Sequence, residues 1–447
     1  MPATAAPSQT ELVIRGGRRL SGTHAVPGNK NAALPMLVAC LLTDEPVTLT
    51  NLPLIEDVRT TLELLGRLGV EHELDAAGRC VTLRAARLAG HELPPDLCAK
   101  VRAAILFAGP LVTRAGSVTI SSPGGDPIGR RRIDTHVAGL QALGARFFRR
   151  APDPDSDAGG AYGFEAPEGL VGADIVLDEA SVTATEDIVM AASVAKGRTT
   201  IYNAACEPHV QDLCAMLNAM GAKISGAGTN LIAIEGVPRL HGATARIGAD
   251  YIDAASYIAA ALVTGGELTA TGVDARDFAV LGKPFAKFGV TWTIEGDTLR
   301  LPGGQHLAVV DDLGGAIPKV EDGIWPAVPS DLMSILIVLA IFAEGTVLFF
   351  EKMFESRLYF VDNLINMGAR IVQCDPHRLV VVGSRKPSLT GCRVVGPDIR
   401  AGIALVIAAL GAKGVSHIQN AQSVDRGYEK VEDRLRELGA DIERRSR

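Results

Sequence analysis

The stretch Met367-Gly368-Ala369-Arg370-Ile371-Val372 joins the end of an amphipathic helix to a β-branched strand. Glycine directly after such a helix commonly adopts the left-handed conformation that terminates it. The same phrase, Leu-Gly-Ala or a close variant, occurs six times, and its glycines are separated by 75, 77, 68, 79 and 71 residues. The phrase alone is a common helix ending, but six copies at near-constant spacing indicate an internal repeat. The other five copies are Leu68-Gly69-Val70, Leu143-Gly144-Ala145, Met220-Gly221-Ala222, Phe288-Gly289-Val290 and Leu438-Gly439-Ala440.

The residues upstream of these phrases repeat as well. Ala195-Lys196-Gly197 leads into the β-rich piece Arg198-Thr199-Thr200-Ile201-Tyr202, and similar turns stand at Ala343-Glu344-Gly345 and Ala412-Lys413-Gly414. The repeating unit is therefore a strand-and-helix module of about 75 residues, which is far longer than a solenoid repeat. Six modules predict an α/β fold of two similar domains, each of three repeated α/β units.

Composition agrees with two packed domains. The chain has 447 residues, of which 47% are hydrophobic and 21% charged, and this exceeds one ordinary domain. The formal charge of −7 argues against general nucleic-acid binding, so no nucleic-acid partner is expected. The seven cysteines are odd in number and form no CxxC pair, which argues against a disulfide framework and favours a reducing compartment.

Membrane, metal and export signals are weak in this sequence. The longest apolar run, Leu332 to Ala343, is too short to span a bilayer and is typical of a buried helix. The start of the chain lacks a basic stretch followed by an apolar run, so a cytoplasmic protein is expected. The nine histidines show neither HxxxH nor HExxH spacing, so we expect neither a metal nor another cofactor.

Two glycine-containing turns carry charged residues suited to an anion. Gly28-Asn29-Lys30-Asn31 directly precedes an apolar helix expected over Ala32 to Leu42. A helix N-terminus with a lysine beside it favours an anion, although an ordinary Asn-rich cap would look the same. In the stretch Ser122 to Arg132, glycines flank Asp126 and three arginines follow. The carboxyl could act as a general acid and the arginines could hold phosphate; the alternative is a solvated basic turn.

Further charged turns lie in the second half of the chain. Asp331 stands at the head of the apolar helix, where it is most simply an N-cap. Arg357 follows a Phe-Glu-Ser phrase, and Arg400 and Arg426 lie in turns where an arginine is ordinarily a surface ion pair. The chain has no Walker A loop and no GxGxxG, so phosphate binding would come from scattered arginines.

Together these turns resemble the enolpyruvyl transferases, from about Leu12 to Glu443, and most closely the branch that acts on UDP-N-acetylglucosamine. The resemblance implies two similar domains, each of three repeated units around parallel inner helices, an arrangement described as an inside-out barrel. Domain I would comprise residues 1–29 and 249–447 and carry Asp331 and the arginines after it. Domain II would comprise residues 30–248 and carry Lys30, Arg102 and the mobile loop around Asp126.

The resemblance also assigns site residues. It implies that Lys30 and Asn31 lie at phosphoenolpyruvate, that Asp126 is the proton donor and that Asp331 contacts the sugar hydroxyl. The remaining substrate-binding positions that it implies are Arg102, Arg131, Asp134, Ser181, Val182, Met353, Arg357, Asp398, Arg400 and Arg426. Arg426 is also expected to take part in catalysis, as is Lys30.

The implied reaction is an addition followed by an elimination. The 3-hydroxyl of UDP-N-acetylglucosamine adds to C2 of phosphoenolpyruvate while C3 is protonated, and phosphate then leaves as C3 loses a proton. Asp126 would be the acid and Asp331 the base, with converging cations stabilising the developing charge. The product is a peptidoglycan precursor, and the expected partners are these two small molecules alone, with no membrane partner and a monomeric chain.

Four positions depart from the family pattern, one of them His209, where a glutamate is common. Asp126 stands where most members have cysteine, which implies insensitivity to fosfomycin because a carboxylate is a poorer nucleophile than a thiolate. Arg132 replaces a usual proline and Glu179 a usual basic residue, with an open effect on acceptor choice. Two alternatives remain: another acceptor, such as shikimate 3-phosphate, or a non-catalytic nucleotide-sugar sensor.

Overall fold

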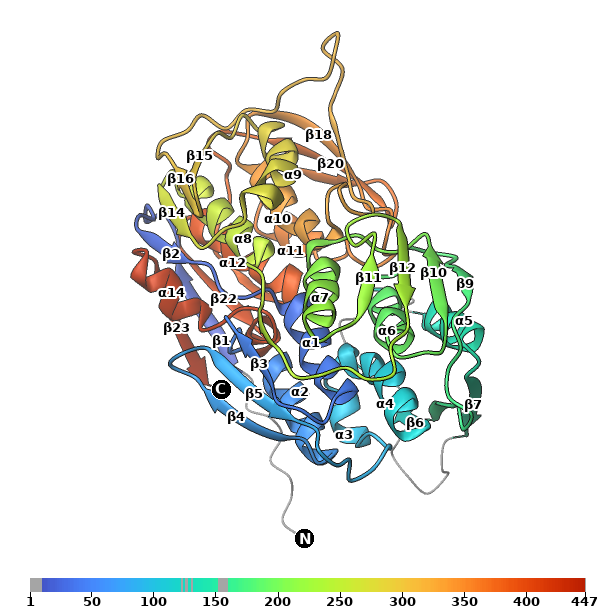
Figure 1. Cartoon of the computed structure of the whole chain (residues 1–447). Helices are drawn as coiled ribbons and strands as arrows, with labels where there is room; N and C mark the ends of the chain where they lie inside the picture. Colours follow the sequence, from blue (N-terminus) through green and yellow to red (C-terminus); the bar gives the residue numbers. More distant parts are fainter. Residues whose placement is uncertain (1–9, 122–123, 125–127, 130–131, 152–159, 447) are drawn as a thin grey trace. The chain divides into compact units, whose positions relative to one another are not determined.

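The computed structural model describes residues 10–446 apart from 122–123, 125–127, 130–131 and 152–159. It contains two compact units. Unit 1 is formed by the described residues within 1–27, 126–130 and 249–447, and unit 2 by those within 28–125 and 131–248. The chain therefore begins in unit 1, crosses to unit 2 and returns (Figure 1). The two compact units describe how the chain packs, and the domain boundaries expected after residues 29 and 248 remain a prediction.

Unit 1 contains three four-stranded sheets with one shared topology. In each, the first two strands are parallel and the next two are added antiparallel. The first sheet has the order β2(Thr23–Ala25), β14(Leu268–Thr271), β16(Thr298–Leu301) and β15(Thr293–Glu295). The second has the order β17(Lys319–Glu321), β18(Gly345–Phe350), β20(Arg378–Gly383) and β19(Ile371–Gln373). The third has the order β21(Arg393–Val395), β22(Val415–Gln419), β1(Thr10–Arg15) and β23(Asp441–Ser446).

Unit 2 repeats this topology. Its first sheet has the order β13(Thr244–Arg246), β3(Val47–Thr50), β5(Cys80–Arg84) and β4(Glu71–Asp75). Another has the order β9(Asp174–Val176), β10(Arg198–Tyr202), β12(Leu231–Glu235) and β11(Lys223–Ser225). The last has three strands, β6(Ser117–Ser121), β8(Ala161–Glu165) and β7(Arg146–Arg150). There a parallel bridge from Glu92 to Thr119 occupies the place of the fourth strand.

The six repeated glycines behave as their position in the sequence predicted. Their φ angles lie between 72° and 105°, and each precedes the outermost antiparallel strand of its sheet. At Gly368, with φ 105°, an added Cβ would also lie 2.8 Å from the carbonyl oxygen of Ser388. Glycine is required there both for its backbone conformation and for lack of space. The expectation of six α/β modules, three in each half, is confirmed.

Each unit surrounds three buried helical segments with amphipathic ones. In unit 1 the inner helices α8(Tyr251–Val263), α10(Ser330–Ile341) and α12(Ile399–Gly411) pack on one another. In unit 2 the inner segments are α1(Lys30–Val38) with the 3-10 turn η1(Ala39–Leu42), η2(Arg102–Phe107) with α4(Ala108–Ala115), and α6(Val182–Ala192). The remaining helices of unit 1 are α9(Ala275–Ala286), α11(Val361–Asn366), α13(Gln422–Asp425) and α14(Val431–Glu437), and those of unit 2 are α2(Glu56–Arg67), α3(Pro95–Cys98), α5(Asp134–Ala142) and α7(Pro208–Ala219).

The apolar run identified in the sequence forms the centre of unit 1. Every residue from Leu332 to Ile341 in α10 is buried, because a helix that is apolar on all faces must be covered on all faces. The prediction of a buried helix is confirmed. Among the residues whose placement the structure describes, no helix combines the length and apolarity needed to cross a membrane. The helix expected over Ala32 to Leu42 begins earlier, at Lys30, and its last turn is the 3-10 turn η1.

Candidate active site

A carboxylate held by two arginines lies at the ends of two inner helices of unit 1. Arg357 donates from Nη2 to Asp331 Oδ1, and Arg400 Nη2 lies the same distance, 3.0 Å, from Asp331 Oδ2. The two guanidinium side chains are only 5% and 6% exposed, whereas Asp331 is 27% exposed. The carboxylate is therefore the most accessible member of this cluster, which we call the Asp331 cluster (Asp331, Arg357, Arg400).

Arg400 is positioned by all three inner helices. It is the second residue of α12, and the N-cap Asp398 accepts hydrogen bonds from the backbone N–H of Arg400 at 2.8 Å and of Ala401 at 2.9 Å. Ser334 of α10 donates its hydroxyl to the Arg400 carbonyl at 3.0 Å. Arg400 Nη1 donates to the Tyr428 hydroxyl at 3.3 Å.

Tyr428 is fixed in turn from α8. Its hydroxyl shares a 2.8 Å hydrogen bond with the hydroxyl of Ser256. Burial raises the pKa of Tyr428 to about 12, so it remains a neutral phenol near neutral pH. Burial alone would lower the pKa of Arg400, but Asp331 and Tyr428 outweigh it and raise that pKa. The guanidinium consequently stays charged throughout the working pH range.

Two simple interpretations of these turns prove wrong. Asp331 does not cap α10, because the N-cap position is Pro329 and Asp331 is the second helical residue. Arg400 is not in a surface ion pair, because it is 5% exposed. In both cases the charged side chain belongs to the Asp331 cluster, and its partner lies far away in the sequence.

The other predicted residues of unit 1 lie on neighbouring segments. Arg357 stacks its guanidinium over the ring of Phe354 at 5.2 Å, and Met353 on the same segment is exposed. Arg426 is half-buried and ends the short helix α13, two residues before Tyr428. Ile128 accepts a hydrogen bond from the backbone N–H of Ser356 at 3.1 Å, so the described end of the predicted loop packs beside Arg357 in unit 1.

In unit 2, Lys30 opens the inner helix α1. Its Nζ lies 2.6 Å from Asp57 Oδ2, and both side chains are largely buried, at 11% and 4% exposed. Asn29 caps the helix by accepting hydrogen bonds from the backbone N–H of Asn31 at 2.7 Å and of Ala32 at 3.1 Å. The Asn-rich cap is therefore confirmed, and it leaves a lysine at the positive end of a helix dipole.

The remaining predicted residues of unit 2 lie around its other two inner segments. Arg102 begins η2 and donates to the carbonyl of Arg132 at 3.4 Å; burial lowers the pKa of Arg102. Arg132 pairs with Asp134, the first residue of α5. Ser181 caps α6 by accepting from the backbone N–H of Ala184 at 3.4 Å, and Val182 is the first residue of that helix.

Two predicted residues, Asp126 and Arg131, lie outside the described residues. Gly124, from the same loop, donates its N–H to the Cys98 carbonyl at 2.9 Å in unit 2. An added Cβ there would lie 1.8 Å from the Ala99 carbonyl oxygen, so this glycine permits a close approach of two backbones.

A family model described as EPSP synthase (3-phosphoshikimate 1-carboxyvinyltransferase) matches residues 14–435. The chain belongs to this enolpyruvyl transferase family. Among its relatives is the UDP-N-acetylglucosamine 1-carboxyvinyltransferase of Treponema denticola, which is 50% identical over 433 residues, covering 97% of this chain and 99% of the relative. A protein of the same name from Bradyrhizobium diazoefficiens is 48% identical over 434 residues, again covering 97% of this chain and 98% of the relative.

Solved structures agree on the fold. The enolpyruvyl transferase NikO of Streptomyces tendae superposes with a TM-score of 0.85 at 24% identity, covering 99% of this chain and all of that one. The EPSP synthase of Acinetobacter baumannii superposes with a TM-score of 0.73 at 18% identity, covering 98% of this chain and all of that one. The enolpyruvyl transferase fold implied by the resemblance is thus confirmed, and the six repeats agree with it.

Two buried carboxyl residues near the cluster, Glu351 and Asp322, were not identified from the sequence of this enolpyruvyl transferase. Glu351 and Asp322 are both fully buried, and Glu351 accepts from the hydroxyl of Ser330, the residue before Asp331. Each directly follows one of two parallel strands, β17 and β18. The available signal was an acidic residue directly after each of two expected strands, because parallel neighbouring strands place such residues at the same end of a sheet.

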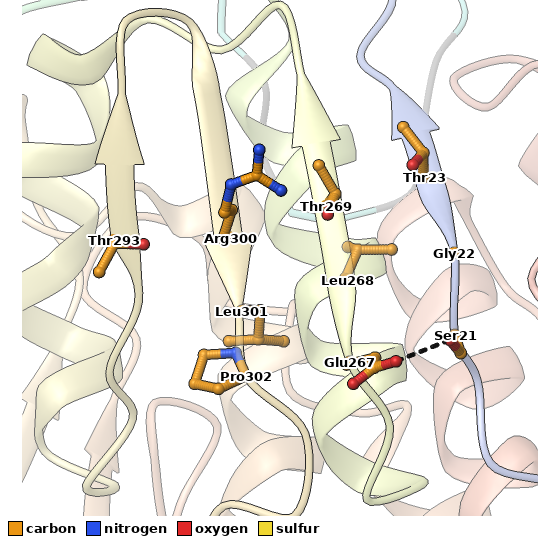
Figure 2. Close-up of a pocket in the computed structure, with 10 residues that line it drawn as sticks. All are labelled: Ser21, Gly22, Thr23, Glu267, Leu268, Thr269, Thr293, Arg300, Leu301 and Pro302. Atoms are coloured by element: carbon orange, nitrogen blue, oxygen red, sulfur yellow. Dashed lines mark hydrogen bonds between the residues drawn. The ribbon is translucent and has the colours of Figure 1, made fainter.

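Unit 1 also contains a pocket that is separate from the Asp331 cluster. A pocket of about 430 Å³ lies over the sheet of β2, β14, β16 and β15 and is lined by residues including Thr23, Thr269, Thr293 and Arg300 (Figure 2). Ser21 donates to Glu267 at 3.1 Å along its margin. No member of the Asp331 cluster lines it.

Proposed function

We propose that this enolpyruvyl transferase moves the enolpyruvyl group of phosphoenolpyruvate to the 3-hydroxyl of UDP-N-acetylglucosamine and releases phosphate. The observation that carries the proposal is identity of 44–50% over nearly the whole chain to relatives named for that activity. The reaction is the first committed step of peptidoglycan precursor synthesis, and we place it in the cytoplasm, performed by a monomer.

Asp331 is proposed as the base. Its two arginine partners favour the charged carboxylate, so it accepts a hydrogen bond from the sugar hydroxyl. As the hydroxyl oxygen forms its bond to C2, the hydroxyl proton becomes strongly acidic and passes to the carboxylate. A paired carboxylate is a weak base, but it needs to accept the proton only at that stage of the reaction.

Cations are proposed to hold the anionic substrate. For phosphoenolpyruvate they are Lys30, Arg131, Arg357, Arg400 and Arg426, whereas Arg102 is proposed to contact the nucleotide sugar. Arginine suits a phosphate or carboxylate because its planar fork donates two parallel hydrogen bonds. Fixed cations in a water-excluding site also stabilise charge that develops in the transition state.

Asp126 is proposed as the acid that protonates C3 and then recovers that proton when phosphate leaves. The first step forms the C2–O bond and a C3–H bond, and the second breaks the C2–O bond to phosphate and the C3–H bond. Asn31, Asp134, Ser181, Val182, Met353 and Asp398 complete the proposed substrate contacts.

Phosphate release from phosphoenolpyruvate tests the proposal, with UDP-N-acetylglucosamine, shikimate 3-phosphate or UMP as acceptor. We expect release with the nucleotide sugar alone, and its loss in Asp126→Ala. Release with a different acceptor would keep the chemistry and change the pathway. An absence of release with every acceptor, while the nucleotide sugar still binds, would favour a sensor.

A further inference from the structure

A pair of buried carboxyl groups lies directly behind the Asp331 cluster. Strands β17 and β18 run parallel with Glu321 opposite Phe350, so the next residues, Asp322 and Glu351, emerge side by side at the same end of the sheet. Both are 0% exposed. Two buried carboxylates would repel each other strongly, which makes a single shared proton the favourable arrangement.

The hydrogen bonds around the pair show where that proton belongs. Glu351 Oε1 accepts from the Ser330 hydroxyl at 2.9 Å and from the backbone N–H of Met353 and of Phe354 at 3.2 and 3.1 Å. Asp322 Oδ1 accepts from the backbone N–H of Lys352 at 2.5 Å. Asp322 Oδ2 is buried and has no donor among the described residues, and its side chain faces Glu351. A proton on Glu351 is the donor that this oxygen needs.

The other charged groups that the structure describes near the pair do not donate a hydrogen bond to Asp322 Oδ2 in place of that proton. Arg357 lowers the pKa of Glu351, but burial and Asp322 outweigh it and raise that pKa to about 9. His377 uses Nδ1–H to bond the backbone carbonyl of Glu351 at 2.7 Å, not its carboxyl. Lys352 is exposed and its Nζ lies 3.6 Å from Glu321.

We propose that Glu351 and Asp322 share one proton and, in that state, position the residues that form the Asp331 cluster. The inference rests on the proposed function, since the cluster is the proposed site of hydroxyl activation. Glu351 holds Ser330, the residue before Asp331, and the backbone of Met353 and Phe354, which leads to Arg357. Both are positioning residues. Loss of the shared proton leaves two adjacent charges, and their repulsion moves the Glu351 carboxyl away from Asp322, which displaces Ser330 and the segment 352–357 that Glu351 holds.

Three variants test the proposal. Glu351→Gln keeps the shape and supplies an amide N–H to Asp322, so it mimics the protonated pair permanently. We expect it to retain most of the kcat/KM at neutral pH and to lack the decline of kcat/KM that we expect for the wild type around pH 9. Glu351→Ala removes the anchor and should lower kcat/KM about 100-fold at every pH, the size expected from an ångström-scale misplacement. The control Glu321→Gln alters a half-buried neighbour, which pairs with Lys319 and Lys352 rather than with Glu351, and should leave both quantities unchanged.

A direct measurement follows the proton itself. Infrared difference spectra of the wild type between neutral pH and pH above about 9 should show loss of a protonated carboxyl band that Glu351→Gln lacks. The same band missing from the wild type at neutral pH would overturn the proposal. So would an unchanged alkaline limb in Glu351→Gln, or a Glu351→Gln enzyme as impaired as Glu351→Ala. The spectra need no substrate, so a wild type inactive with every acceptor would contradict the proposed function and still leave the shared proton tested.

Discussion

At the scale of single residues, Asp331 combines two electrostatic interactions. It lies in the first turn, where a carboxylate interacts favourably with the helix dipole, and it also binds two buried guanidinium groups. Burying two arginines is unfavourable unless each finds an anion, so removing this one carboxylate leaves two charges without their compensation.

We therefore expect Asp331→Asn to abolish most activity. The amide is isosteric but neutral, so it neither takes the proton nor balances the arginines, and general-base loss alone is worth about 10²–10⁴-fold. Steady-state phosphate release measures kcat/KM. The matched control is Asp375→Asn, an aspartate of the same unit whose arginine partner Arg378, at 2.9 Å, is exposed. Similar losses in both variants would contradict the role of Asp331.

The residue at position 126 predicts the response to fosfomycin. With aspartate there, the enzyme should keep its activity under fosfomycin, because a carboxylate attacks the epoxide far less readily than a thiolate. Asp126→Cys should become sensitive and gain one covalent adduct, measured by intact-protein mass spectrometry. Stoichiometric labelling of Asp126 in the unaltered chain would refute this prediction.

At the scale of elements, several of the residues proposed to bind substrate lie at the starts of inner helices. Lys30, Ser181, Asp331 and Arg400 each lie in the first turn or N-cap of an inner segment. A helix interior is committed to packing, whereas its first turn has unpaired N–H groups and faces outward from the buried stretch. These four modules thus place a polar side chain at the N-terminal end of an otherwise apolar helix.

Two N-cap variants, one at α12 and one at α9, test whether a helix cap supports activity as well as stability. Asp398→Ala removes an acceptor for two backbone N–H groups and should lower the free energy of unfolding by about 1 kcal/mol. It should also lower kcat/KM, because Arg400 follows the cap by two residues. Asp274→Ala removes the N-cap of α9, which accepts from the backbone N–H of Arg276 at 2.9 Å. Its loss should affect denaturant unfolding alone, and equal activity losses would show that capping has no special role at α12.

At the scale of the whole molecule, the first and last strands of the chain share a sheet. β1 lies between β22 and β23, so residues near both ends of the sequence complete the same module (Figure 1). Six sheets with one topology each cover part of a helical core, and no single module could bury its apolar helix alone. We therefore expect each unit of three modules, and not a single module, to be the smallest part that folds stably.

The buried carboxyl of Glu351 makes global stability depend on pH. Burial raises its pKa from 4.5 in the unfolded chain to about 9 in the folded one. The folded state thus binds more protons between these values, so its contribution to the free energy of unfolding is full below about pH 4.5 and declines as pH rises to about 9. Denaturant unfolding at several pH values should show a shallower decline for Glu351→Gln than for the wild type. Parallel curves for the two proteins would contradict the shifted pKa.

Much of the fold could be predicted because its signals are local. A glycine after an amphipathic helix specifies a left-handed turn wherever it occurs, and the six φ angles agree. The burial of Leu332 to Ile341 follows from their apolar character alone. The sequence also identified the turns that carry Asp331, Arg357 and Arg400, since charged residues beside apolar helices stand out.

Which of these groups contact one another depends on how distant segments pack together. Asp331, Arg357 and Arg400 come from three separate segments, and nothing local distinguishes a surface arginine from one that is 5% exposed. Glu351 and Asp322 became partners through the register of two parallel strands, which depends on sheet assembly rather than on either strand's sequence. The six modules, and the helix starts at which Lys30, Asp331 and Arg400 lie, follow from local sequence patterns alone. The pairing of Asp331 with its two arginines and the protonation of Glu351 depend instead on packing, because segments far apart in the chain set the distances between these groups and their burial.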